Sequence, residues 1–261
     1  MPNSMTLSTS PSRGRQPVVR FPKPSGRSHL RLFCFAYAGG SVNAYYRWAE
    51  VLAPSAELGL VNLPGREDRI AERSAGEMGD LVRVLGRAML PYLDKPMAFF
   101  GHSMGALLAF ELARQLRREY GAEPEQLFVS GCRPPQEVGT DVHDDGLAPT
   151  PGELPDSPRS GGGSWCDGEL ARLLLPPLLA DLAVWRAYRY ASEPPLCCGI
   201  TGYGGQEDQG VPRECLQGWK DETASGFVSN LFPGGHFFIH TAESLVLKVL
   251  AGQLRELAAR V

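Results

Sequence analysis

The pentapeptide Gly101-His102-Ser103-Met104-Gly105 constrains the fold more than any other stretch of this chain. It follows an apolar run at residues 97–100, typical of a buried strand, and precedes an apolar-rich segment at 106–113 with the character of a helix. Glycines on both sides of a serine, on a strand-to-helix turn, form the pattern of a nucleophile elbow. The turn is too sharp for side chains at the glycine positions, and it lifts the serine hydroxyl out of the sheet. We therefore expect Ser103 to be a catalytic nucleophile.

The pattern by itself is weak, because the chain contains 30 glycines and a glycine-rich loop can hold a serine by chance. The flanking strand and helix carry the prediction. Six strand candidates alternate with helical segments, and this alternation predicts an α/β fold with a mostly parallel sheet and helices on both faces. The candidates span residues 30–36, 56–63, 97–100, 126–130, 197–203 and 227–232.

Three segments define the expected domain organisation. Residues 1–26 are rich in Ser, Pro and Arg and lack the apolar centre of a secretory signal, so we expect a disordered leader. Residues 27–261 are long enough for one α/β domain. Within it, residues 141–190 change from polar and Gly/Pro-rich to apolar around Pro176-Pro177, which predicts two helical pieces and a lid insertion. The alternative is a plain connecting helix beside a disordered loop.

A serine nucleophile needs a base, and five histidines compete for that role. His236 follows the last strand candidate directly, in Pro-Gly-Gly-His, and is our candidate base. His29 lies at the opposite edge of the sheet, and His143 lies in the polar segment. His102 lies inside the elbow, where we expect its ring to point away from the base. His240 is expected at the start of the last helix, and a metal-binding pair with His236 is the competing interpretation.

The remaining site candidates also follow strands, and ligands bind at the carboxyl ends of strands in such sheets. Asp208 is our candidate for the acid that orients the base, with the adjacent Glu207 as the alternative if the register differs by one residue. The order Ser, Asp, His is that of α/β-hydrolases. The backbone amides of Met104 and Ala38 are the candidate oxyanion donors, with Tyr37 as second choice for the latter.

Composition excludes several function classes. The formal net charge is -3, which gives no basic surface for nucleic acid, and no apolar run is long enough to cross a bilayer. The six cysteines contain no Cys-x-x-Cys pair, so we expect reduced thiols in a cytoplasmic protein rather than disulfides or a zinc site. We expect neither a metal nor a resident cofactor.

Several motifs together resemble the type II thioesterases of polyketide and nonribosomal peptide synthases. The resemblance covers roughly residues 30–261 and is far more specific than the elbow alone. The matching stretches are Phe35-Ala36-Tyr37-Ala38-Gly39-Gly40-Ser41, Leu63-Pro64-Gly65-Arg66, Gly101-His102-Ser103-Met104-Gly105, Ser130-Gly131-Cys132-Arg133-Pro134-Pro135 and Gly234-Gly235-His236-Phe237-Phe238.

The resemblance implies an α/β-hydrolase fold with a small helical lid. It also implies hydrolysis of acyl thioesters on the phosphopantetheine arms of acyl or peptidyl carrier proteins, with the phosphopantetheine belonging to the substrate. By matching motif positions, Ser103 is the nucleophile, His236 the base and Asp208 the acid, while Ala38 and Met104 donate to the oxyanion. The segment 141–168 is more Gly/Pro-rich and looks shorter than the family's lid entry. The alternatives are a carboxylesterase, lipase or acyltransferase on the same fold, or a binding module without catalysis.

Overall fold

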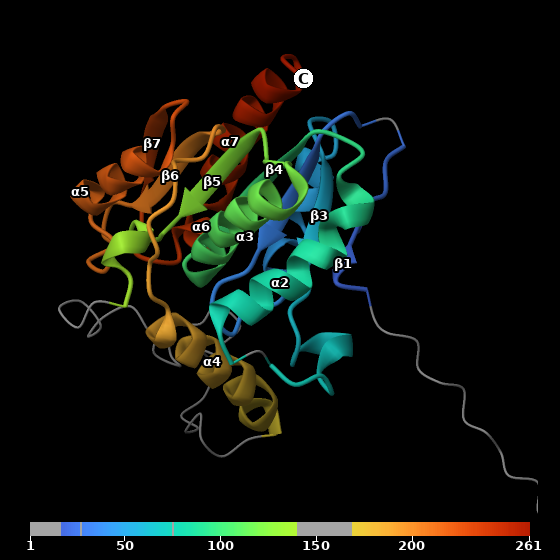
Figure 1. The fold of residues 1–261 in the computed structure, drawn as a ribbon, viewed down its shortest axis with the longest axis vertical. Helices are drawn as coiled ribbons and strands as arrows, with labels where there is room; N and C mark the ends of the chain where they lie inside the picture. The colour runs from blue at the N-terminus through green and yellow to red at the C-terminus, as the bar shows by residue number, and fades with distance from the viewer. Residues whose placement is uncertain (1–16, 27, 75, 140–168) are drawn as a thin grey trace, which may run out of the picture.

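A single seven-stranded sheet forms the centre of the protein in a computed structural model that describes residues 17–26, 28–74, 76–139 and 169–261 (Figure 1). The strand order is β1-β3-β2-β4-β5-β6-β7. Strands β2 to β7 run parallel to one another, and β1 pairs with β3 in the antiparallel direction. The six strands predicted from the sequence are confirmed. The strands are β1 (Val19–Arg20), β2 (Arg31–Phe35), β3 (Glu57–Val61), β4 (Met97–His102), β5 (Gln126–Ser130), β6 (Gly199–Gly205) and β7 (Phe227–Phe232).

The short strand β1 corrects the prediction of a disordered leader over residues 1–26. Val19 is buried and pairs with Val61 on β3. Val18 and Phe21 pack against the hydrophobic core. This segment covers an edge of β3 that would otherwise offer unpaired backbone groups, so residues 17–26 belong to the domain. Residues 1–16 of the predicted leader lie outside the described residues.

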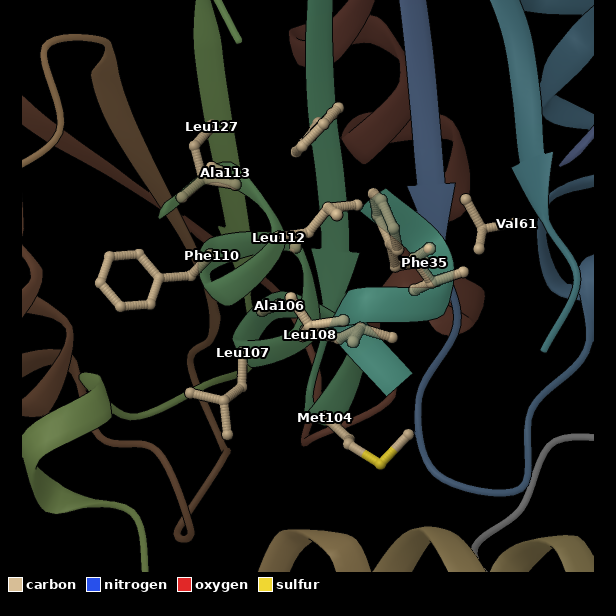
Figure 2. Close-up of a cluster of buried hydrophobic side chains, with 14 of the residues drawn as sticks. Phe35, Val61, Met104, Ala106, Leu107, Leu108, Phe110, Leu112, Ala113 and Leu127 are labelled. Atoms are coloured by element: carbon tan, nitrogen blue, oxygen red, sulfur yellow. The ribbon is translucent and has the colours of Figure 1, made fainter. Parts of the chain in front are cut away.

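Helices cover both faces of the sheet, as predicted. One core cluster joins α2 and α3 to one face, and a second joins α1 and α7 to the other. Figure 2 shows α3 side chains of the first cluster, with Met104 at the N-terminal end of the helix pointing toward α4. The helices are α1 (Trp48–Leu52), α2 (Met78–Met89), α3 (Met104–Tyr120), α4 (Glu169–Ala187), α5 (Arg213–Leu216), α6 (Phe238–Thr241) and α7 (Glu243–Ala258), with 3-10 turns at Val42–Tyr45, Glu67–Arg69, Leu90–Tyr92, Pro135–Glu137 and Gln217–Glu222.

Helix α4 lies beyond the carboxyl ends of the parallel strands (Figure 1). It runs without a break through Pro176 and Pro177, so the prediction of two helical pieces is wrong. Its second half is held by packing, since Val184 and Trp185 belong to the first core cluster. Residues 141–168 of the predicted lid lie outside the described residues. Within the described part of the chain, none of the helices has the length and apolar character needed to span a bilayer.

Candidate active site

The backbone packing around Ser103 forms a strained elbow between β4 and α3. Ser103 has φ 53° and ψ -124°, a conformation that is costly for a residue with a side chain. A Cβ added at Gly101 would lie 2.2 Å from the Gly105 carbonyl oxygen, and one added at Gly105 would lie 2.2 Å from the Phe35 carbonyl oxygen. The Ser103 amide continues the β ladder by donating to the Ser130 carbonyl at 2.7 Å. Both glycines are therefore required, as the sequence predicts.

His236 and Asp208 form the second part of the site. The Nδ1 atom of His236 lies 2.8 Å from Oδ2 of Asp208, and Nδ1 is the donor because an ionised carboxylate only accepts. The other carboxylate oxygen, Oδ1, accepts from the amides of Gly210 and Val211 at 3.0 and 3.1 Å. Burial by itself raises the pKa of Asp208, but His236 and the two amides outweigh it and lower the pKa below its ordinary value. The adjacent Glu207 is exposed and does not take this position.

The opposite side of the His236 ring faces the elbow without bonding to it. Its Nε2 atom is buried and has no hydrogen-bond partner among the residues described. The ring centroid lies 5.1 Å from that of His102, the residue directly before Ser103. The structure thus brings Ser103, Asp208 and His236 to one edge of the sheet, with the Asp208–His236 bond formed and a Ser103–His236 bond not formed. Such bonds are often long or misaligned before substrate binds.

The two candidate oxyanion donors lie at neighbouring segments of the same edge. Met104 is the first residue of α3, so its amide has no acceptor within the helix. Ala38 lies in the loop after β2. A Cβ added at Gly105 would overlap the Phe35 and Ala36 carbonyl oxygens, so the start of α3 packs directly against the end of that strand. Neither amide donates to a backbone carbonyl in the described segments. Tyr37, the second choice, has its hydroxyl 3.2 Å from Nε2 of His240.

Comparison with known proteins identifies the family. Residues 30–252 match the sequence model of the thioesterase domain. The chain belongs to the thioesterase family. It is 37% identical over 230 residues to the gramicidin S biosynthesis protein GrsT of Aneurinibacillus migulanus, a match that covers 87% of this chain and 89% of GrsT.

Solved structures support the same conclusion. The type II thioesterase BorB from the borrelidin biosynthetic cluster has a TM-score of 0.75 and 31% identity, over 91% of this chain and 96% of BorB. The thioesterase RedJ from the prodiginine pathway of Streptomyces coelicolor has a TM-score of 0.76 and 34% identity, over 89% of this chain and 91% of RedJ. These findings confirm the resemblance to type II thioesterases and the α/β-hydrolase fold. The protein is a thioester hydrolase, so the alternative of a binding module without catalysis is not supported.

His102 of this thioesterase departs from its expected orientation. Its ring was expected to point away from the base, yet it lies against His236. Its Nδ1 atom lies 2.9 Å from Oγ of Ser130. Burial, followed by the neighbouring imidazoles of His236 and His240, lowers the pKa of His102 well below its ordinary value. His102 therefore stays neutral at physiological pH and adds no competing charge beside His236.

Two charged residues near the thioesterase site were missed from the sequence. Arg66 belongs to a cluster of charges whose simplest interpretation is a solvated loop, but it is only 6% exposed and pairs with Asp181 of α4. Asp181 is the single charged residue in the otherwise apolar stretch 173–185, and this isolation is the only feature of the sequence that indicates a buried partner for it. Buried charges are almost always paired, so a lone carboxylate on an apolar helix face indicates a partner elsewhere in the chain.

The metal-binding alternative for His236 and His240 finds no support in the geometry. The Nδ1 atom of His236 is engaged by Asp208, and His240 lies beside Tyr37. No group of three or more His, Cys, Asp or Glu side chains among the described residues is arranged to hold a metal ion.

Proposed function

We propose that this thioesterase hydrolyses acyl groups carried as thioesters on the phosphopantetheine arms of acyl or peptidyl carrier proteins, in the cytoplasm. In this role it clears stalled or incorrect acyl units from a polyketide or nonribosomal peptide synthase. The observation that carries the chemistry is the strained Ser103 elbow at the same sheet edge as the bonded His236–Asp208 pair. The biosynthetic roles of its relatives GrsT, BorB and RedJ support the choice of carrier-bound substrates.

The first half of the proposed reaction forms an acyl-enzyme. Nε2 of His236 takes the proton of the Ser103 hydroxyl while Oγ attacks the thioester carbonyl carbon. The amides of Ala38 and Met104 stabilise the negative oxygen of the tetrahedral intermediate. The C–S bond then breaks, and the protonated imidazole returns its proton to the departing pantetheine sulfur. Asp208 fixes the tautomer with Nδ1 protonated and stabilises the imidazolium between these proton transfers.

The second half releases the free acid by the same groups. Nε2 of His236 takes a proton from water, and the hydroxide attacks the acyl carbon on Ser103. The intermediate collapses with cleavage of the bond to Oγ, and His236 returns the proton to the serine. The protein needs no metal or resident cofactor for either half. In an acyltransferase, a second nucleophile would replace water at this step.

The test compares three substrates with the same acyl group: an acyl-carrier protein, an acyl-pantetheine and a simple ester. We expect the highest kcat/KM for the acyl-carrier protein and free acid as the product. Ser103→Ala should lose almost all turnover, with a residual rate of about 10³- to 10⁴-fold over the uncatalysed reaction. Equal turnover by Ser103→Ala would contradict the mechanism. A preference for the simple ester would favour a carboxylesterase, and transfer of the acyl group to an added nucleophile would favour an acyltransferase.

A further inference from the structure

The loop that carries Ala38 is a tight turn closed by one backbone hydrogen bond. The Gly40 amide donates to the Tyr37 carbonyl at 2.8 Å, which closes a four-residue turn. Gly39 occupies the third position of the turn with φ 71°, in the region that favours glycine. The amides of the two central residues, Ala38 and Gly39, take no part in the closing bond. The direction of the Ala38 amide therefore depends on what holds the turn from outside.

Helix α4 holds the turn through the Gly39 amide. Oδ2 of Asp181 accepts from the Gly39 nitrogen at 2.8 Å, although the two residues are 142 positions apart. Leu178, one helical turn before Asp181, lies so close that a Cβ at Gly39 would be 3.0 Å from the Leu178 Cβ. The carboxylate thus takes one of the two central amides of the turn, and the Ala38 amide is left for another acceptor.

Arg66 fixes the carboxylate and the far end of the same turn. One guanidinium nitrogen of Arg66 donates to both oxygens of Asp181 at 2.8 Å, and the other donates to the Gly40 carbonyl at 2.6 Å. Both side chains are 6% exposed. Burial raises the pKa of Asp181, while Arg66 and the Gly39 amide act in the opposite direction. The loop after β2, the loop after β3 and α4 therefore meet at one buried ionic centre.

Stability alone does not account for this arrangement. Removing two charges from water is costly, and apolar side chains of similar volume often stabilise a protein as well as a buried ion pair does. An apolar residue at position 181 would pack in its place but could not accept the Gly39 amide. What the pair supplies is a fixed direction for the turn, and an oxyanion hole works only when its donors point at the position where the negative charge develops.

We propose that Asp181, held by Arg66, is a positioning residue that orients the turn Tyr37–Gly40 so that the Ala38 amide points at the developing oxyanion. This inference rests on the proposed function, because it assigns Asp181 a part in the same reaction. On the other side of Ala38, Tyr37 is bonded to His240 and its ring packs edge-on against His102. Both neighbours of Ala38 are therefore anchored. Gly39 is held by Asp181 of α4, and Tyr37 is held by His102 and His240.

The test separates orientation from folding with two variants. Arg66→Met/Asp181→Leu removes both buried charges together, and Asp181→Asn keeps the shape of the side chain but cannot satisfy Gly39 and both contacts of Arg66. Asp80→Asn is the control, because Asp80 also pairs with an arginine, Arg83, but on an exposed face of α2. For each variant, kcat and KM are measured with an acyl-pantetheine. The affinity for an alkyl boronic acid, which forms a tetrahedral adduct on a catalytic serine, and the thermal midpoint are measured alongside.

We expect both test variants to lose about 10- to 100-fold in kcat with little change in KM. The boronic acid affinity should fall by the same factor, since that adduct reports binding of the tetrahedral state. Asp80→Asn should match the parent. Unchanged kcat and boronic acid affinity in a folded variant would overturn the positioning role, and so would a lower thermal midpoint with unchanged boronic acid affinity. If the double variant does not fold, Asp181→Asn decides. Full activity of Ser103→Ala would instead overturn the proposed function.

Discussion

The proposed nucleophile and the proposed base of this site are held in place by different means. Ser103 is fixed by the main chain, since neither Gly101 nor Gly105 has room for a single added carbon. The His236 side chain is 20% exposed and is oriented by one hydrogen bond to Asp208, with its Nε2 atom unpaired among the described residues. The elbow is thus set by main-chain packing, whereas the imidazole is set by side-chain contacts. Changes at the elbow should therefore affect stability, and changes at the acid should affect turnover.

The largest expected effect follows from replacing the acid. Asp208→Asn should lower kcat/KM about 10⁴-fold, because the amide no longer fixes the Nδ1-protonated tautomer or stabilises the imidazolium. Glu207→Gln is the matched control, as its side chain is exposed and next in sequence. It should stay within about twofold of the parent. Steady-state kinetics on an acyl-pantetheine checks both variants, and the reverse ranking would mean that Glu207 orients the base in solution.

A second prediction concerns the elbow. Gly105→Ala should lower the free energy of unfolding by about 3 kcal/mol or more, because its Cβ would overlap the Phe35 and Ala36 carbonyl oxygens. Gly252→Ala in α7 is the control, since the nearest atom to its Cβ is the end of the Arg255 side chain at 3.9 Å. That change should raise stability by about 0.5–1 kcal/mol. Urea unfolding gives both values, and a neutral Gly105→Ala would show that main-chain packing does not fix the elbow.

The smallest expected effect is a pH dependence of folding stability that comes from His102, the residue that lies between the Ser103 elbow and His236. His102 is fully buried beside His236 and His240, and its pKa is lowered in the folded protein. Below the unfolded pKa of about 6.5, the unfolded chain gains a proton that the folded chain does not, so stability falls as pH falls. The slope of this contribution approaches about 1.4 kcal/mol per pH unit once the pH is about one unit or more below that value.

This contribution is measured by urea unfolding between pH 7 and pH 5 of the parent and of His102→Gln, which cannot titrate. The parent should lose stability more steeply than the variant as pH falls. Parallel curves would show that His102 takes up a proton in the folded protein as readily as in the unfolded chain.

Local patterns predicted most of the sheet and the elbow. The apolar runs marked the six parallel strands, and the two glycines around Ser103 marked the elbow. The two-residue strand β1 was missed because it is too short to show alternation. The choice of Asp208 over Glu207 depended on the register of a glycine-rich strand end, and the structure places Asp208 against His236.

Features that depend on distant segments could not be predicted. The Arg66–Asp181 pair joins residues 115 positions apart, and nothing local to Arg66 indicates burial. The continuity of α4 through Pro176 and Pro177 opposes the local preference of proline and reflects packing of the second half of the helix. The position of His102 against His236 arises only when the loop after β7 folds back over β4.

The most direct test of the catalytic assignment is covalent labelling with a fluorophosphonate, read by peptide mass spectrometry. We expect one added phosphonyl group on the peptide that contains Ser103. We also expect no labelling of that peptide in Ser103→Ala and much slower labelling in His236→Gln. Labelling of another residue at the parent rate, or equal labelling of Ser103 with and without the His236 imidazole, would contradict the assignment of Ser103 as nucleophile and His236 as base.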